Sequence, residues 1–432
     1  MEFFFSIIFG KIVNFFIRTF NLGSGSTWPG HIALSVNKNF IKDLLGKNQN
    51  LKVILIAGTN GKTTTGKLIQ TILDKNNKKV FQNTAGANLL NGIASALIIN
   101  SNLSGKIDKD FGIFEIDENT LPLILKEIEN PDFIILLNLF RDQLDRYGEI
   151  DTITSAWKKS LDSLSSKTTL ILNADDPQIA SLALRLKGVN VKFFGLNDAN
   201  LTTFKVQHAS DSLYCPECKS KLSYSSVFYS HLGIWECLEC KNARPKLNYY
   251  NSPIYPLAGI YNHYNTIAAV SLSRQLNISE KDIPPALKSF KPAFGRQENL
   301  EINGKKVQIF LSKNPTSLNE SLRTIVNLNA KNLLILLNDR IPDGRDVSWI
   351  WDVSFEDFSS QFKNITASGD RALDMGLRLK YAEFENFEIE ENLEKAIGIS
   401  LEKTSKNETL YILPTYSAML EVRRILTGKK IL

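Results

Sequence analysis

The sequence has 432 residues, 43% of them hydrophobic and 22% charged, which suits two or three folded domains and excludes a disordered, collagen-like or coiled-coil chain. Its 51 Lys and Arg against 45 Asp and Glu give a net charge of +6, too mild over this length for a nucleic-acid-binding stripe. All four cysteines fall in one short stretch, which excludes a disulfide framework and indicates a reducing, cytoplasmic compartment.

The first twenty residues are the most apolar segment and predict an amphipathic helix. Lys11 and Arg18 interrupt it, so no run of roughly 18 to 20 uncharged residues is available to span a bilayer. Two interpretations stay open: a helix packed on the protein, or a helix lying on the inner face of the cell membrane. With a turn-rich linker at Gly23–Gly30, this helix makes up an expected N-terminal region of residues 1–45.

From Lys52 onward, short apolar runs alternate with helical stretches, the pattern of a parallel sheet covered by helices on both faces. We therefore expect a central α/β domain over residues 46–298. Its strands are predicted at Val53–Ala57, Val80–Gln82, Gly112–Ile116, Phe133–Asn138, Thr169–Asn173 and Val191–Phe194. Its helices are predicted to begin near Lys62, Ala87, Leu121 and Thr152, and a later one to cover Asn262–Leu276.

The alternation breaks at residues 201–256, which we interpret as an insertion, and it resumes in a second, Rossmann-like α/β domain over residues 299–432. The strands of this domain are predicted at Val307–Leu311, Leu333–Leu337, Ile365–Ser368 and Thr409–Leu413. Its helices are predicted near Ser317, Arg371, Asn392 and Ala418.

Residues Val53–Thr65 read VILIAGTNGKTTT: a buried strand, a glycine loop and the start of a helix. Gly58 and Gly61 allow backbone N–H groups to turn inward around phosphate oxygens, and the helix adds the positive end of its dipole. Lys62 is placed to reach the terminal phosphates, and the Thr63 hydroxyl to ligate Mg²⁺. The segment therefore predicts a nucleotide phosphate site.

The sequence GTNGKTT resembles the nucleotide loop of the Mur ligases and folylpolyglutamate synthases. These ATP-dependent enzymes convert a carboxylate to an acyl phosphate and let an amine displace the phosphate. The resemblance implies a Mur-ligase-like P-loop ATPase domain that uses ATP and Mg²⁺. It assigns ATP binding to the whole loop, Gly58, Thr59, Asn60, Gly61, Lys62, Thr63 and Thr64.

Two further segments resemble the metal-binding motifs of this family. Glu115 ends a predicted strand where the family has its second Mg²⁺ carboxylate, so the resemblance gives it a catalytic role beside Lys62. Residues 138–147 are similar to the segment N-x-x-x-D-H-L-D, with Gln143 in place of a metal-linked histidine. The position of the carbamylated lysine of many Mur ligases falls near Trp157, so we expect no carbamylation here.

Three other motifs follow in the order of the family. Residues 173–177 resemble its N-x-D-D/N turn. Asn262, within GIYNHYN, corresponds to a contact with the nucleotide base, whereas His263 beside it is expected to be structural. Arg296, within FGRQE, corresponds to an arginine that reaches phosphate.

Cys215, Cys218, Cys237 and Cys240 form two C-x-x-C pairs separated by 18 residues. This spacing is typical of a four-thiolate structural zinc site, here a zinc ribbon that stabilises an insertion too small to bury its own core. A redox dithiol and a nucleic-acid-reading ribbon are the alternatives, and the mixed local charge disfavours the second.

A zinc ribbon within such a domain narrows the resemblance to the MurT family, the ligase subunits of lipid II isoglutaminyl synthase. Residues 27–34, TWPGHIAL, resemble the opening segment of that family, and the resemblance covers nearly the whole chain. The phosphate loop begins at Gly58, which leaves no room for an N-terminal UDP-binding domain. A lipid-linked acceptor, lipid II, fits that difference.

Residues 338–352, NDRIPDGRDVSWIWD, follow a predicted strand, where open α/β sheets place ligand contacts. Asp343 has the character of a nucleotide-closing carboxylate, although a Pro-Asp-Gly turn explains it equally well. In the MurT family the W-I-W-D stretch lends an acid to the active site of a class I glutaminase partner of the GatD type. The resemblance puts Asp352 in that catalytic role, with Asp346 in reserve.

The sequence thus predicts an ATP-dependent amidoligase subunit of peptidoglycan biosynthesis. It would amidate the D-glutamate α-carboxylate of the lipid II stem peptide with ammonia from the glutaminase. A stand-alone Mur-type or folylpolyglutamate-type ligase that joins an amino acid is one alternative, and a nucleotide-gated zinc-ribbon scaffold is another. Neither alternative needs both the four cysteines and the W-I-W-D stretch.

Overall fold

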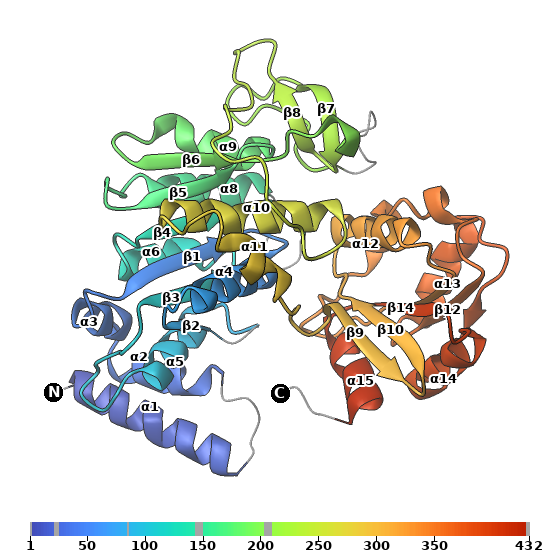
Figure 1. The fold of residues 1–432 in the computed structure, drawn as a ribbon, viewed down its shortest axis with the longest axis horizontal. Coiled ribbons are helices and arrows are strands. Elements are labelled where there is room, and N and C mark those ends of the chain that lie inside the picture. Colours follow the sequence, from blue (N-terminus) through green and yellow to red (C-terminus); the bar gives the residue numbers. More distant parts are fainter. Residues whose placement is uncertain (1, 21–25, 84–85, 143–149, 203–209, 429–432) are drawn as a thin grey trace.

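Two six-stranded sheets, each in its own α/β unit, organise the chain (Figure 1). The computed structural model describes residues 2–20, 26–83, 86–142, 150–202 and 210–428. A two-stranded hairpin projects from the first unit at the top of the view, and the second unit stands to the right. The fold therefore has the two α/β units that the sequence predicts.

The central sheet is entirely parallel, in the order β2-β3-β1-β4-β5-β6. Its strands confirm all six sequence predictions with small differences at the ends: β1 (Lys52–Ala57), β2 (Val80–Gln82), β3 (Phe111–Ile116), β4 (Phe133–Leu136), β5 (Thr169–Asn173) and β6 (Asn190–Phe194).

Helices cover both faces of this sheet, which is why its strands are apolar without alternation. In β1, Ile54 and Ile56 face a core shared with α4 (Lys62–Lys75), α10 (Ile260–Gln275) and α11 (Ile283–Lys288). Val53 and Leu55 face the opposite core. That second core includes α5 (Leu90–Asn100), α6 (Leu121–Glu127), α8 (Ile150–Leu161) and α9 (Pro177–Ser181).

Three helices precede β1: α1 (Glu2–Thr19), α2 (Trp28–Val36) and α3 (Phe40–Gly46). The sequence predicts α1 but neither of the other two. Trp28–Gly30, expected in a linker, instead form the first turn of α2, where Pro29 is tolerated because that turn has N–H groups without helical partners. α1 packs on α2, α3 and α5 (Figure 1).

The insertion after β6 holds an antiparallel hairpin, β7 (Ser223–Tyr229) and β8 (Leu232–Glu236). Trp235 on β8 donates from Nε1 to the Ala174 carbonyl at 3.0 Å, which ties the hairpin to the end of β5. Lys158 of α8 pairs with Glu217 of the hairpin region at 2.5 Å. The hairpin is therefore docked on the central unit.

The second sheet has the order β13-β12-β11-β14-β10-β9, with β9 antiparallel at the edge. Its strands are β9 (Arg296–Ile302), β10 (Lys305–Phe310), β11 (Asn332–Leu336), β12 (Asn364–Ser368), β13 (Glu388–Ile389) and β14 (Thr409–Pro414). Its α-helices are α12 (Pro315–Asn327), α13 (Ala372–Tyr381), α14 (Leu393–Lys403) and α15 (Tyr416–Thr427). Four strands and four helices confirm the sequence prediction, whereas β9 and β13 were not expected.

Candidate active site

The loop between β1 and α4 has the backbone that a phosphate cradle needs. Gly58 has φ +139° and Gly61 has φ +94°, values that L side chains rarely adopt. A Cβ atom on Gly58 would lie 2.9 Å from the Asn138 carbonyl oxygen. Asn138 also accepts from the Asn60 N–H at 2.9 Å and donates to the Asn60 carbonyl at 3.0 Å. The neighbouring β4 therefore fixes the loop.

Two groups of the loop face acidic side chains from the end of β3. The Lys62 ammonium donates to the Gly58 carbonyl at 2.5 Å and lies 3.2 Å from Glu118 Oε2. The Thr63 hydroxyl donates to Glu115 Oε2 at 2.8 Å. Because a hydroxyl and a carboxylate are hard oxygen ligands, this pair fits one side of a Mg²⁺ site.

Glu115 is buried, and its burial raises the pKa of its carboxyl above the usual value. The hydrogen bond from Thr63 and the charges of Arg296 and Lys62 oppose that rise in pKa. Burial makes the charged form of this carboxylate unfavourable, and a bound cation would stabilise it.

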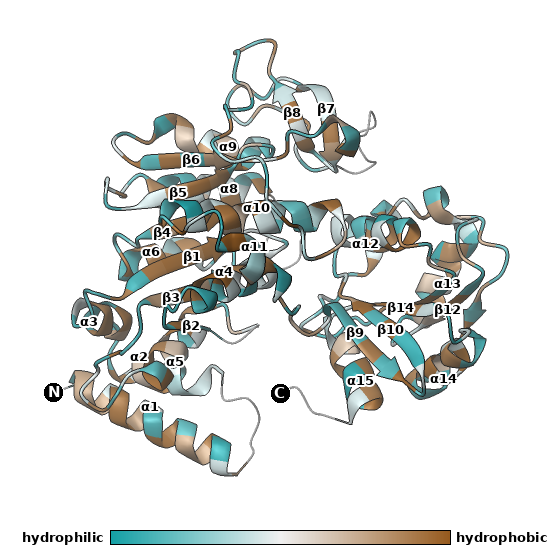
Figure 2. Cartoon of the chain, in the orientation of Figure 1, coloured by the Kyte–Doolittle hydropathy of each residue, from teal (hydrophilic) through white to brown (hydrophobic). Residues whose placement is uncertain are grey.

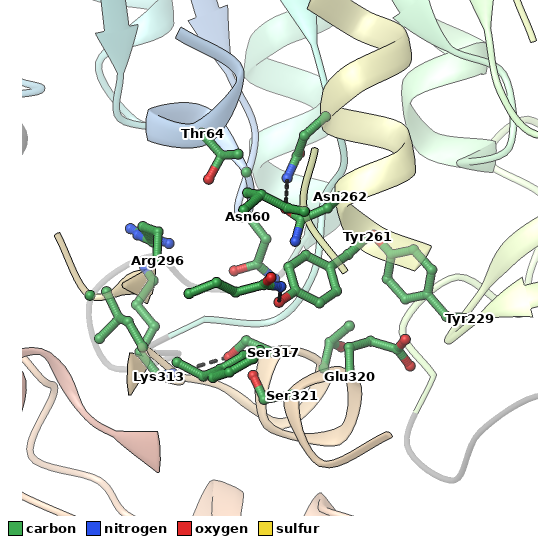
Figure 3. Close-up of a pocket in the computed structure, with 18 residues that line it drawn as sticks. Asn60, Thr64, Tyr229, Tyr261, Asn262, Arg296, Lys313, Ser317, Glu320 and Ser321 are labelled. Carbon is green, nitrogen blue, oxygen red and sulfur yellow. Dashed lines mark hydrogen bonds between the residues drawn. The ribbon is translucent and has the colours of Figure 1, made fainter. Parts of the chain in front are cut away.

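Two hollows lie on either side of the loop, between the central and the C-terminal unit. The first hollow lies against Asn60, Gly61 and Thr64 and has aromatic walls (Figure 3). Its apolar lining is Tyr229 from the end of β7, Leu257, Tyr261 from α10, and Phe310 and Leu311 from the end of β10. Asn262 lines it as well, held by a hydrogen bond to the Ala258 carbonyl at 2.7 Å. A flat aromatic base fits this lining.

The second hollow, of about 230 Å³, is more polar and takes in Lys62, Thr63, Glu115 and Glu118. Residues from the loop before α5 line it too, Asn88 and Leu89 among them, and Tyr416 of α15 closes it from the C-terminal unit. This hollow has room for an acceptor carboxylate beside the phosphate loop.

Arg296 and Lys313 line both hollows. The Arg296 guanidinium makes no hydrogen bond within the part of the chain that the structure describes, and burial lowers its pKa. Lys313 pairs with buried Asp142. Lys313 was missed by the sequence analysis, although it comes soon after β10, at the carboxyl edge of a parallel strand, where ligand contacts gather.

Other residues that the sequence singled out lie elsewhere. Asp343 lines neither hollow, because its carboxylate accepts hydrogen bonds from the Ser417 N–H, at 2.8 Å, and from the Ser417 hydroxyl in the first turn of α15. His263 stacks on Tyr255 with ring centroids 3.9 Å apart. Gln143 falls outside the described residues.

Asp352 is the last residue of the 3₁₀ turn Ser348–Asp352, and it lines a third hollow. Its carboxylate lies 3.3 Å from Arg141 Nη2, and about a third of its side chain is exposed. Asp346 and Lys313 line the same hollow. Trp351, half exposed, packs edge-on against Tyr381 nearby. Trp351 and Asp352 are therefore at the surface, whereas Ile350 is buried, and the third hollow shares Lys313 with the second.

The four cysteine sulfur atoms lie within 4.8 Å of one another. The two C-x-x-C turns have the same geometry. Lys219 and Lys241 each follow the second cysteine of a pair, with φ of +62° and +63°. Their backbone N–H groups donate to the carbonyls of Cys215 and Cys237. Two such matched turns hold four thiol groups in the arrangement that a tetrahedral metal site needs.

Comparison with known proteins agrees with this geometry. Residues 56–273 match the family described as Mur ligase middle domain, and residues 311–419 match the family described as MurT ligase C-terminal. A pseudomurein peptide ligase type C from Methanothermus fervidus superposes with a TM-score of 0.66 at 22% identity, covering 90% of this chain and 81% of that one. MurF from Acinetobacter baumannii superposes with a TM-score of 0.64 at 17% identity, covering 92% and 80%. The fold and the phosphate loop thus define a ligase of the Mur type.

Two curated relatives are more similar in sequence. The lipid II isoglutaminyl synthase (glutamine-hydrolyzing) subunit MurT of Staphylococcus aureus strain COL is 34% identical, over 84% of each chain. The subunit of the same name from Streptococcus pneumoniae strain R6 is 32% identical, over 95% of this chain and 94% of that one. The chain belongs to the MurT family.

Proposed function

We propose that this chain is the ligase subunit of a lipid II isoglutaminyl synthase. It uses ATP to amidate the D-glutamate α-carboxylate of the lipid II stem peptide, giving D-isoglutamine for peptidoglycan biosynthesis. The observation that carries the proposal is the meeting of Lys62 and the Thr63–Glu115 pair with a polar hollow at the junction of the two units. Membership of the MurT family supports the choice of acceptor and nitrogen donor.

The reaction balances in two steps. The γ-phosphoryl group of ATP passes to an oxygen of the carboxylate, which releases ADP and leaves an acyl phosphate. The nitrogen of ammonia then bonds to the carbonyl carbon, the bond to the phosphate oxygen breaks with its electron pair, and the nitrogen loses a proton. Lys62 and Arg296, which face the second hollow, neutralise charge on the moving phosphoryl group.

The loop Gly58–Thr64 holds the ATP phosphates in this proposal, and Asn262 with Tyr229 and Tyr261 holds the base. Thr63 and Glu115 would hold Mg²⁺, whose charge would neutralise that of the phosphates. A Zn²⁺ ion on the four cysteines makes the β7–β8 hairpin a zinc ribbon, with a structural role.

The partner in this proposal is a class I glutaminase, which supplies ammonia. All four thiols of the chain belong to the cysteine cluster, so none is left as a nucleophile for glutamine hydrolysis. Asp352 is exposed enough to reach a partner's histidine, and its hollow shares Lys313 with the second hollow. Ammonia released from glutamine in the partner's site beside Asp352 would therefore travel only a short way to the acyl phosphate.

We propose the domain boundaries 1–45, 46–298 and 299–432, with the ribbon at 201–256. The edge strand β9 spans the second junction, since it begins at Arg296 and pairs with β10. The C-terminal domain carries the surface for the glutaminase. Work on a lipid acceptor places the complex at the inner face of the membrane, and no helix among the described residues is long and apolar enough to cross one.

The test compares two nitrogen donors. The chain and its glutaminase, given ATP, Mg²⁺ and lipid II, should form the amide from glutamine or from ammonium. Asp352→Asn should lower the glutamine-driven rate by about 10²-fold or more and leave the ammonium-driven rate unchanged, because Asp352 acts on the partner's histidine and lines neither hollow at the phosphate loop. The control Asp346→Asn keeps both rates if Asp352 is the acid.

Three outcomes contradict the proposal. Incorporation of an amino acid by the chain alone would identify a stand-alone ligase. ATP hydrolysis that is indifferent to lipid II and ammonium would identify a nucleotide-gated scaffold. Equal loss with both nitrogen donors in Asp352→Asn would place that carboxylate in the ligase reaction instead of the partner's site.

A further inference from the structure

One face of α1 is exposed and mostly apolar. Within 2–20 lie eight of the 24 exposed large hydrophobic side chains found in the described part of the chain. Their spacing of three and four residues puts them on one side of the helix. We call this set the α1 outer face: Phe4, Phe5, Ile8, Phe9, Ile12, Phe15, Phe16 and Phe20.

The opposite face of α1 is firmly attached to the protein. Ile7 and Gly10 are buried, and Gly10 lies so close to α5 that a Cβ atom there would come within 2.7 Å of Ile98. The Lys11 ammonium donates to the carbonyls of Ile98 at 3.0 Å and Ser101 at 2.5 Å. The helix is therefore held in place by one face, and it lies at the lower edge of the molecule (Figure 2).

Cations stand beside the outer face. Arg18 is exposed near the end of α1, and Lys47, directly after α3, lies 4.3 Å from the ring centroid of Phe3 and 4.7 Å from that of Phe4. Glu2, in the first turn, is the one acid of the helix. Aromatic and aliphatic side chains bordered by Lys and Arg are the chemistry of a helix that lies in the interface of an anionic bilayer.

We propose that the α1 outer face docks this chain onto the anionic phospholipid surface of a membrane. α1 lies in the interface plane, with its phenylalanines among the acyl chains and Arg18 and Lys47 at the phosphate level. An apolar area of this size stays in contact with water in the isolated chain, and burial in lipid removes it. The charges beside the face add attraction to anionic headgroups.

The docking surface also sets the height of the active site, a step that rests on the proposed function. α1 packs on α5, and α5 begins at Leu90, directly after Asn88 and Leu89 of the second hollow. α2 also packs on both α1 and α5, so a packed stack of helices connects the membrane plane to that hollow. In this proposal a head group that projects from the bilayer reaches the phosphate loop while its lipid stays in the membrane.

The experiment measures binding to vesicles that contain no lipid II. The full chain, alone and with its glutaminase, is sedimented with phosphatidylglycerol-containing vesicles and with pure phosphatidylcholine vesicles. Binding should be stronger to the anionic vesicles. The double variant Phe15→Ser/Phe16→Ser should bind them at least about tenfold more weakly. A second pair, Phe5→Ser/Phe9→Ser, tests the other end of the face.

The matched control is Leu184→Ser/Leu373→Ser, which removes two equally exposed apolar side chains far from α1 and should bind as the wild type does. In detergent micelles, where no docking is needed, both Phe variants should amidate lipid II at the wild-type rate. Wild-type amidation in micelles tests the proposed function, and vesicle binding tests the docking surface, so either can fail alone.

Several results would overturn the docking proposal. Wild-type protein that stays in solution with anionic vesicles is one, and equal loss of binding in the control pair is another. A third is wild-type protein that does not bind vesicles, together with a Phe15→Ser/Phe16→Ser variant that no longer associates with the glutaminase or with a second copy. That result would show that the outer face is a protein interface.

Discussion

The phosphate loop and the cysteine hairpin both line the first hollow, but different interactions stabilise their conformations. The loop presents its own residues: Asn60, Gly61 and Thr64 line the hollow directly. The hairpin contributes Tyr229, which lies at the far end of β7 from the sulfur atoms. The loop is shaped by glycine torsions and one neighbouring strand, whereas the hairpin depends on the four thiols to hold a minimal core together.

This difference indicates how each region should respond to damage. A change in the loop acts on the reacting phosphates, so it should reduce the rate. A change at the cysteines acts through Tyr229 and the docking of Trp235, so it should weaken nucleotide binding and stability first. The predictions below test that division, from the largest expected effect to the smallest.

Removal of the loop ammonium should have the largest effect. Lys62→Ala should lower amide formation by about 10³-fold with ammonium as donor, because charge on the moving phosphoryl group loses its partner. Lys67→Ala, on the same helix but bonded to Gln70, is the matched control and should keep the wild-type rate. Equal rates of amide formation in the two variants would show that Lys62 takes no part in the reaction.

Gly61→Ala should damage the loop through its backbone. The residue has φ +94°, and its new Cβ would lie 2.1 Å from Asn265 Oδ1, so Asn265 must move and release Asn262. We expect ATP affinity, measured by calorimetry, to fall on the order of tenfold to 10²-fold. Gly188→Ala shares a positive φ of +75° but meets open space, and it should cost only about 1 kcal/mol of unfolding free energy. Similar ATP affinities in the two variants would contradict this account.

Loss of the proposed zinc ion should weaken nucleotide binding without stopping the chemistry. Cys237→Ser should lower the zinc content, change the fluorescence of buried Trp235 and raise the ATP dissociation constant about tenfold, because Tyr229 loses its fixed position against the base. The control Tyr214→Ala, at an exposed residue that precedes the hairpin, should retain zinc and affinity. A zinc-free protein that binds ATP with wild-type affinity would show that the hairpin does not contribute to nucleotide binding.

The smallest effect concerns pH. Burial raises the pKa of Glu115, so this carboxyl takes up a proton at a higher pH than an ordinary glutamate does. Protons and Mg²⁺ compete for the same oxygens, and the Mg²⁺ concentration for half-maximal rate should rise several-fold as the pH is lowered. Glu115→Asp should retain this dependence, whereas Glu115→Gln should abolish it along with most activity. A flat profile in the wild type would exclude Glu115 as a ligand.

The parts of the site that the sequence predicted are those specified by contiguous residues. The loop GTNGKTT, the two C-x-x-C turns and the alternating strands each carry their geometry in a short segment, and the structure has them. Lys313 and Tyr229 could not be found this way, because only the approach of β10 and the hairpin to the loop brings them there.

The remaining differences have equally local causes. Helices α2 and α3 are short, and Pro29 and the preceding glycines resemble a linker. Strand β9 alternates polar side chains at a sheet edge, so it lacks the apolar run of a central strand. Asp343 offers a carboxylate after a turn, and the sequence does not show that Ser417, 74 residues later, uses it to begin α15.

The central claim is that the carboxylate is activated as an acyl phosphate on this chain. Lipid II labelled with ¹⁸O in the D-glutamate α-carboxylate, supplied with ATP, Mg²⁺ and ammonium, tests it directly. The account predicts that one labelled oxygen appears in inorganic phosphate for every amide formed, and that Lys62→Ala forms neither. Amide formation with unlabelled phosphate would contradict it.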